Sequence, residues 1–150
     1  NLKTDMIIAG IENTLKAGIS PGLNIIFGNL DEDMETLKKD VDFLLKYDDG
    51  AQIRTIRPVT PYPGTELYQI AIERGLLKNI GDFYENKHTN SDLLTCNFTQ
   101  MTDEEFYKAL DWANGVLLDA YLDKVKEKNR LCLFELYQKH NAEFRGFRPV

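Results

Sequence analysis

The feature that most constrains this chain is a short strand pattern that occurs twice, with one helix pattern between the two copies. Residues 22–28 form a mostly apolar, β-branched run bounded by glycines, which is typical of a strand buried on both faces. Residues 52–57, with the sequence QIRTIR, are predicted to form a second strand, and Pro58 ends it because proline cannot donate to a β ladder. This order predicts two parallel strands with a right-handed crossover, in which Ile25 and Ile56 lie on neighbouring strands.

The helix between the two strands shows an apolar stripe at Met34, Leu37, Val41 and Leu44. Residues 31–33 place three acids at its start, where negative charge is stabilised by the helix dipole. These acids would repel a phosphate, so we interpret them as partners of the helix start.

Further helix patterns lie on both sides of the strands. Thr4 is expected to cap a helix that ends at Ala17, and Thr65 is expected to cap another that ends at Gly75.

The second half of the chain is predicted to be a loop followed by helices. Residues 76–101 contain several helix breakers and one candidate short strand, residues 93–98. Residues 102–105 have the sequence of a capping box, which predicts the start of a long helix. A separate last helix is expected at residues 131–140, before an irregular tail at 145–150.

Charge and composition exclude several classes of partner. The net charge of −6 and the isoelectric point near 4.9 disfavour nucleic acid. No segment approaches the roughly 18 apolar residues that span a bilayer, so we expect no membrane partner and a cytoplasmic protein. The two cysteines and two histidines, Cys96, Cys132, His88 and His140, lack the spacing of metal ligands.

Two parallel strands do not make a stable sheet by themselves, because both faces and both edges of the sheet need cover. We therefore expect this chain to be part of a larger protein. The same deduction predicts exposed apolar edges, self-association of the chain through its strand edges, or an additional non-native packing.

Three segments carry a resemblance to a known family. Residues 16–19, residues 23–33 and residues 57–68, the last with the sequence RPVTPYPGTELY, resemble the radical S-adenosylmethionine (SAM) superfamily. Within it they are most similar to the cobalamin-binding branch that includes anaerobic Mg-protoporphyrin IX monomethyl ester oxidative cyclase. At the turn after residue 27 only Gly28 and Glu32 match the usual glycine-leucine-proline-glycine-glutamate-threonine sequence of that family.

The resemblance implies an α/β fold that is the C-terminal part of a partial TIM-type (βα)6 barrel with parallel strands, followed by an α-helical extension. Residues 23–27 would be the fifth strand, residues 52–57 the sixth strand and residues 4–17 the fourth helix. Residues 1–75 would then belong to the barrel, and residues 76–150 would form the loop and the helical extension.

The same resemblance implies cofactors that the whole enzyme binds. Members hold a 4Fe–4S cluster on three cysteines spaced C-x3-C-x2-C, and this motif is absent from the chain. We expect SAM and the cluster in the parent enzyme, with cobalamin as a candidate further cofactor, and none bound to this chain alone. The chain alone is therefore expected to be inactive and to need the rest of the barrel as its partner.

The candidate cofactor-binding residues lie on and just after the two strands. Strand alternation that turns Phe27 toward the outer helices would turn Asn24, Ile26 and Gly28 toward the barrel lumen, where Asn24 can hydrogen-bond a ligand. The resemblance implies that Ile26 and Gly28 lie against the adenine of SAM. It also implies that the backbone at Pro58, Val59 and Thr60 closes over the adenine. Simple packing of Ile26 is an equal alternative.

Two arginines on the second strand, Arg54 and Arg57, are three residues apart. Because side chains alternate between the two faces of a strand, they should point to opposite faces, so one of them can bind a carboxylate of SAM or of a small-molecule substrate. We assign Arg57 to this role, and a buried pair with Asp or Glu is the alternative for either arginine. The sequence contains no recognisable catalytic triad or carboxylate pair, so we assign no catalytic residue and no metal ligand.

These observations leave two functional hypotheses. In the first, the parent enzyme cleaves SAM reductively and uses the 5′-deoxyadenosyl radical on a tetrapyrrole or another organic substrate, and this chain supplies part of the wall. In the second, the chain is a non-enzymatic interaction domain, whose C-terminal helices form a docking surface.

Overall fold

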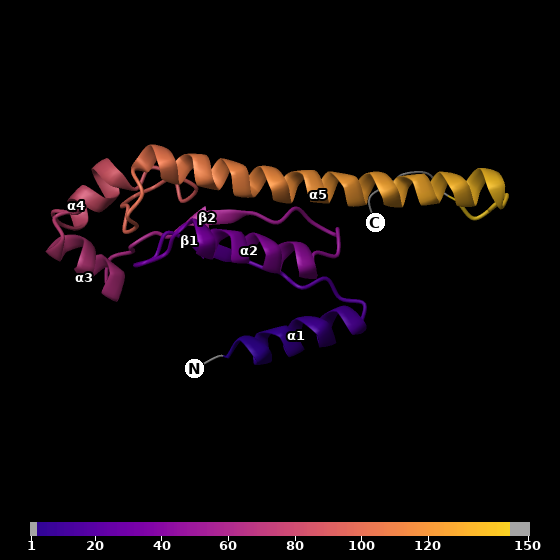
Figure 1. Cartoon of the computed structure of the whole chain (residues 1–150), viewed down its shortest axis with the longest axis horizontal. Coiled ribbons are helices and arrows are strands. Elements are labelled where there is room, and N and C mark those ends of the chain that lie inside the picture. The colour runs from indigo at the N-terminus through magenta and orange to yellow at the C-terminus, as the bar shows by residue number, and fades with distance from the viewer. Residues whose placement is uncertain (1–2, 145–150) are drawn as a thin grey trace.

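The computed structural model of this chain describes residues 3–144, and it confirms an α/β fold with two parallel strands. In order, the elements are α1 (Thr4–Lys16), β1 (Ile25–Phe27), α2 (Met34–Tyr47), β2 (Ile56–Pro58), α3 (Glu66–Glu73), α4 (Ile80–Asp82), the π-helix η1 (Phe83–Lys87) and α5 (Asp103–Gln138). Figure 1 shows an elongated molecule, in which α5 runs along one side and α1 lies farthest from it, beyond α2.

The two strands pair in parallel, with Ile25 opposite Ile56 and Ile26 opposite Arg57. The prediction that Ile25 and Ile56 lie on neighbouring strands is therefore confirmed. Each strand is three residues long, shorter than the predicted runs. Ahead of β2, the side chain of Arg54 is bound by carboxylates of the preceding turn, and the ladder begins at Ile56.

The helix starts agree with the sequence in one case and differ in another. The hydroxyl of Thr65 accepts a hydrogen bond from the N–H of Tyr68, which confirms Thr65 as the cap of α3. The prediction for Thr4 is wrong, because Lys3 occupies the N-cap position without a side-chain cap and Thr4 is already helical. The positive φ of Gly18 (74°) fits the predicted end of this helix.

The region after α3 was predicted mainly as loop, but it contains α4 and η1. The short strand predicted at residues 93–98 does not form. Instead the N–H of Leu94 donates to the hydroxyl of Tyr107 at 3.0 Å, and Cys96 and Phe98 are buried. Burial raises the pKa of the Cys96 thiol to about 11.

The long helix α5 begins at the predicted capping box, which Thr102 and Glu105 form reciprocally. The predicted division into two helices is wrong, because α5 continues without a break through Asn129 to Gln138. One asparagine costs a helix only about 0.7 kcal/mol relative to alanine, which is too little to end it. The predicted tail at 145–150 lies outside the described residues.

The core consists of two clusters. The first lies between the sheet, α2 and α5, and its centre is the stacked pair of Phe27 and Phe106, whose rings are 5.2 Å apart. The second lies around α3 and η1, and Val59 and Phe83 belong to it. The first cluster covers one face of the sheet, and neither cluster includes Ile26 or Arg57 of the opposite face.

Candidate functional site

The sheet has one covered face and one bare face. Phe27 and Ile56 point into the core between α2 and α5. Ile26 is 52% exposed, and the side chain of Arg57, its partner in the register, is 60% exposed. Asn24 is exposed as well. We call the surface formed by Asn24, Ile26 and Arg57 the bare face, and it unites three of the seven predicted site residues.

The two arginines lie in different environments, as their parity predicted. Arg54 is buried and bound to Asp49 at 3.2 Å, with Asp48 at 3.9 Å, which matches the alternative of a buried ion pair. Arg57 pairs with Asp92 at 2.9 Å, and both side chains of this pair are more than half exposed. An exposed pair of this kind contributes little to stability, so a ligand carboxylate can replace Asp92 at Arg57.

Gly28 does not point toward the bare face, so this part of the prediction is wrong. Its φ of +103° breaks the strand alternation, and a Cβ at this position would lie 2.8 Å from the ring of Phe106. The residue must be glycine because a side chain has neither an allowed backbone conformation nor space. Gly28 therefore lets the chain turn closely over α5.

The other three predicted residues follow β2 directly. Pro58 and Val59 are buried, and Thr60 is half-buried. The N–H of Val59 donates to the carbonyl of Phe27 at 2.8 Å, which extends the pairing of the two strands. The side chain of Val59 belongs to the second core cluster, so at this position only the backbone can approach a ligand.

The acidic residues after β1 shape the loop. The Glu32 carboxylate accepts hydrogen bonds from the N–H groups of Gly28 and Asn29, at 2.7 and 2.8 Å. Asp33 caps α2 by accepting from the N–H and the hydroxyl of Thr36, and these bonds lower the pKa of Asp33. The interpretation of this run as partners of the helix start is confirmed for Asp33.

One edge of the sheet is closed by a side chain that the sequence analysis missed. The Asn114 amide on α5 accepts from the N–H of Ile56 at 2.9 Å and donates to its carbonyl at 3.0 Å. This amide replaces a neighbouring strand. A signal existed, because Asn114 is a polar residue four positions after Leu110 and three before Leu117, on the apolar stripe of α5.

The other edge of the sheet remains open. Because the carbonyl of Phe27 bonds to Val59, Phe27 directs its backbone groups toward β2, and Ile26 directs its own to the opposite side. Among the described residues β1 has β2 as its only neighbour. A groove of about 880 Å³ runs beside this edge between α1 and α2, and Asn24 lines it.

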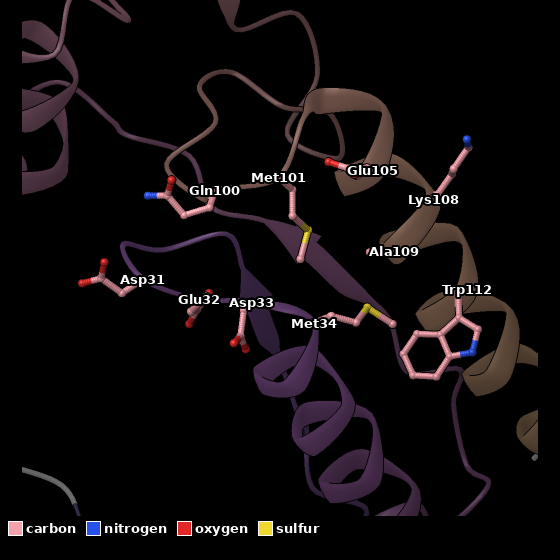
Figure 2. A pocket seen from close by; sticks show the side chains of 10 residues that line it. All are labelled: Asp31, Glu32, Asp33, Met34, Gln100, Met101, Glu105, Lys108, Ala109 and Trp112. Carbon is pink, nitrogen blue, oxygen red and sulfur yellow. The ribbon is translucent and has the colours of Figure 1, made fainter.

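Two further cavities lie near the sheet. One of about 400 Å³ borders the bare face and is lined by Arg57, Asp92 and Asn114 among others. Another of about 750 Å³ lies between the loop after β1 and the start of α5. Figure 2 shows that Met34 and Trp112 face each other across it, while the carboxylate of Asp31 points away.

None of the seven predicted residues lines this last cavity. Most of its acids already have structural partners: Glu32 closes the loop, Asp33 caps α2 and Glu105 caps α5. The cavity therefore presents mainly methionine and tryptophan side chains, and it is separate from the bare face.

No family model, curated protein or solved structure matches this chain. Within residues 3–144, no three His, Cys, Asp or Glu side chains are grouped closely enough to hold a metal ion. No helix in the same range is both long and apolar enough to cross a membrane. The candidate site is therefore defined by the geometry of the sheet alone.

Proposed function

We propose that this chain forms the C-terminal wall of a parallel barrel of the radical SAM type, whose preceding strands pair with the open edge of β1. One observation carries this proposal. The sheet is complete at the β2 edge, where Asn114 and α5 close it, and incomplete at the β1 edge and on the bare face. A last barrel strand followed by a helical extension would show this asymmetry.

The bare face has the chemistry that SAM binding needs. Ile26 offers an exposed apolar surface to an adenine, and Arg57 beside it offers a guanidinium to a carboxylate. Both residues lie near the C-terminal ends of parallel strands, where barrel enzymes bind their ligands. When bound at a reduced cluster, SAM supplies a 5′-deoxyadenosyl radical to the reaction.

The residues of this chain do not fit the iron–sulfur cluster itself. Cys96 is buried in the second core cluster, and Cys132 lies far along α5, well after the strands. In this proposal the cluster is therefore held by the preceding part of the barrel, and the role of this chain is to bind and orient SAM.

The proposal is tested first on the chain as it exists. Anaerobic reconstitution with iron and sulfide should give no cluster absorbance in the visible range. Stoichiometric cluster binding would show that the chain is not an inert wall. The coding sequence ahead of Asn1 should contain C-x3-C-x2-C about a hundred residues upstream, as expected for a barrel of this size.

A second test uses the longer protein that the upstream sequence would encode. Ile26→Glu places a charge on the bare face and should weaken SAM binding by about tenfold, because an apolar contact is replaced by a carboxylate. Ile80→Glu, at a residue that is 56% exposed on α4, is the matched control and should leave SAM binding unchanged. Equal SAM affinity for both variants and the parent contradicts the proposed site.

One observation favours the alternative of a docking domain. The second half of α5 carries exposed apolar side chains, including Leu122 and Leu133. If the chain is such a domain, the longer protein should form no 5′-deoxyadenosine from SAM.

A further inference from the structure

The second half of α5 leaves the body of the molecule. Lys124 contacts the turn before β2, where its ammonium pairs with Asp48 at 2.9 Å and its side chain covers Gly50. From there α5 continues to Gln138, and Figure 1 shows this part extending past the other elements. A single exposed helix of this length is marginal in water, so its stability calls for a further contact.

One stripe of this helix has the spacing of a coiled coil. Its six members alternate in steps of four and three residues: Leu118, Leu122, Val125, Asn129, Cys132 and Leu136. In heptad notation they fill d, a, d, a, d and a, and we call them the seam. Leu118 is 40% exposed and Leu122 is 51% exposed.

The seam does not face the body of the molecule. Two residues of α5 that contact the body are Leu117, which is buried in the core, and Lys124, which pairs with Asp48. Each directly precedes a seam residue, Leu118 or Val125. Because one residue corresponds to about 100° around an α-helix, the seam is turned away from the face that contacts the body. A second helix can therefore lie along the seam without displacing the contacts of α5 with α2 and β2.

We propose that the partner is a second copy of this chain, and that two α5 helices form a parallel coiled coil along the seam. This proposal names the partner for the docking alternative, and it does not depend on the barrel proposal. In a parallel pair Asn129 faces its own copy at an a position, where asparagine specifies the two-stranded state and the register.

The flanking charges favour the parallel over the antiparallel arrangement. In register and parallel, Lys126 at e lies beside Tyr121 of the second copy, and Lys128 at g lies beside Leu133. In an antiparallel pair with Leu122 opposite Cys132, Lys126 would lie close to Lys126 of the other chain. Lys128 would likewise lie close to Lys128 of the other chain. Like charges at these positions are destabilising, so the parallel arrangement is preferred.

The first test compares two glutamate variants of the full chain by sedimentation equilibrium. The unmodified chain should show a concentration-dependent dimer. Leu122→Glu, on the seam, should weaken the dimer by about a hundredfold, because two buried leucines become charged. Leu131→Glu, at a residue that is 59% exposed but off the seam, should leave the dimer intact.

Circular dichroism shows whether both variants retain their helices, so a folding defect is not mistaken for a lost dimer. A chain that remains monomeric at all concentrations overturns the proposal. Equal weakening of the dimer by both variants also overturns it.

The second test determines the direction of the helices. In a parallel pair Cys132 faces its own copy at a d position, whereas in an antiparallel pair it faces Leu122. Oxidised glutathione should therefore link two copies of a Cys96→Ala chain through Cys132, and the product should be a dimer on a non-reducing gel. Cys132→Ser should abolish this product. A dimer in solution that gives no Cys132 cross-link contradicts the parallel arrangement.

Discussion

The two strands of this sheet have the same length and direction, but their surroundings differ. β2 is closed at its outer edge by the Asn114 amide and is covered by the core residues of α5. β1 has an open outer edge, and its residue Ile26 lies on the bare face. α5 therefore closes the outer edge of β2 and leaves the outer edge of β1 open.

The two faces of the sheet also differ, and this difference separates structural residues from candidate binding residues. On the covered face, polar groups are paired with each other in buried positions, as Arg54 is with Asp49. On the bare face, Arg57 and Asp92 form a pair that is open to water and to a ligand. Substitutions of the same kind on the two faces should therefore have different effects.

The largest expected difference is between the two arginines. Arg54→Met should destabilise the fold by roughly 3–5 kcal/mol, because Asp48 and Asp49 lose a buried partner. Arg57→Met should change stability by less than about 1 kcal/mol, since its pair is exposed. Urea unfolding of both variants measures the contrast, and similar losses at both positions would contradict it.

A second contrast uses isoleucines on adjacent strands. Ile56→Ala should cost roughly 2–4 kcal/mol, because Ile56 is 2% exposed and its removal leaves a cavity in the first core cluster. Ile26→Ala should cost no more than about 0.5 kcal/mol. Thermal unfolding of the two variants tests this, and a large loss for Ile26→Ala would show that the bare face is covered in solution.

The third prediction concerns the closed edge itself. Asn114→Leu should cost roughly 1–3 kcal/mol, because the N–H and the carbonyl of Ile56 lose their partner. It should also create a second open edge and promote aggregation. Asn24→Leu, at the open edge, serves as the control and should leave the free energy of unfolding nearly unchanged. Light scattering and urea unfolding report the two effects.

Local sequence patterns predicted the parts of the fold that local physics determines. The strand patterns around Ile25 and Ile56 predicted the parallel strands, and Thr65 and Thr102 marked two helix starts. The alternation of side chains along a strand predicted that Arg54 and Arg57 would lie on opposite faces, although it did not show which arginine would be buried. That depended on the turn before β2, which places Asp48 and Asp49 beside Arg54.

The remaining features depend on contacts between distant segments. The closed edge joins Asn114 to Ile56 across 58 residues. The polar position on the apolar stripe of α5 marks Asn114, but nothing in the sequence identifies Ile56 as its partner. Gly28 matched a strand pattern, but its positive φ follows from the approach of Phe106 and from the carboxylate of Glu32. The pattern of α5 contained one weak breaker, Asn129, which the helix tolerates.

The smallest expected effect concerns the acid stability of two helix starts, those of α2 and α5. Hydrogen bonds from Thr36 lower the pKa of Asp33 below 3.8, and hydrogen bonds from Thr102 lower the pKa of Glu105 below 4.5. Both carboxylates therefore stabilise the fold above their unfolded pKa values, and this contribution is lost as the pH falls through their folded pKa values. The double variant Asp33→Asn and Glu105→Gln should therefore lose less stability than the parent chain when the pH is lowered from about 5 to about 3. This range includes the ordinary pKa values of both carboxylates, 3.8 and 4.5.

Asp40 provides a control of opposite sign for the same measurement. Burial, together with the nearby charge of Glu32, raises the pKa of Asp40, so its ionised form opposes folding at neutral pH. Asp40→Asn should therefore stabilise the chain at pH 7 more than at pH 3, whereas the capping variants should have the opposite pH dependence. Urea unfolding across this pH range distinguishes the two. An unchanged acid slope in the capping variants would show that Asp33 and Glu105 hold their helix starts through geometry rather than charge.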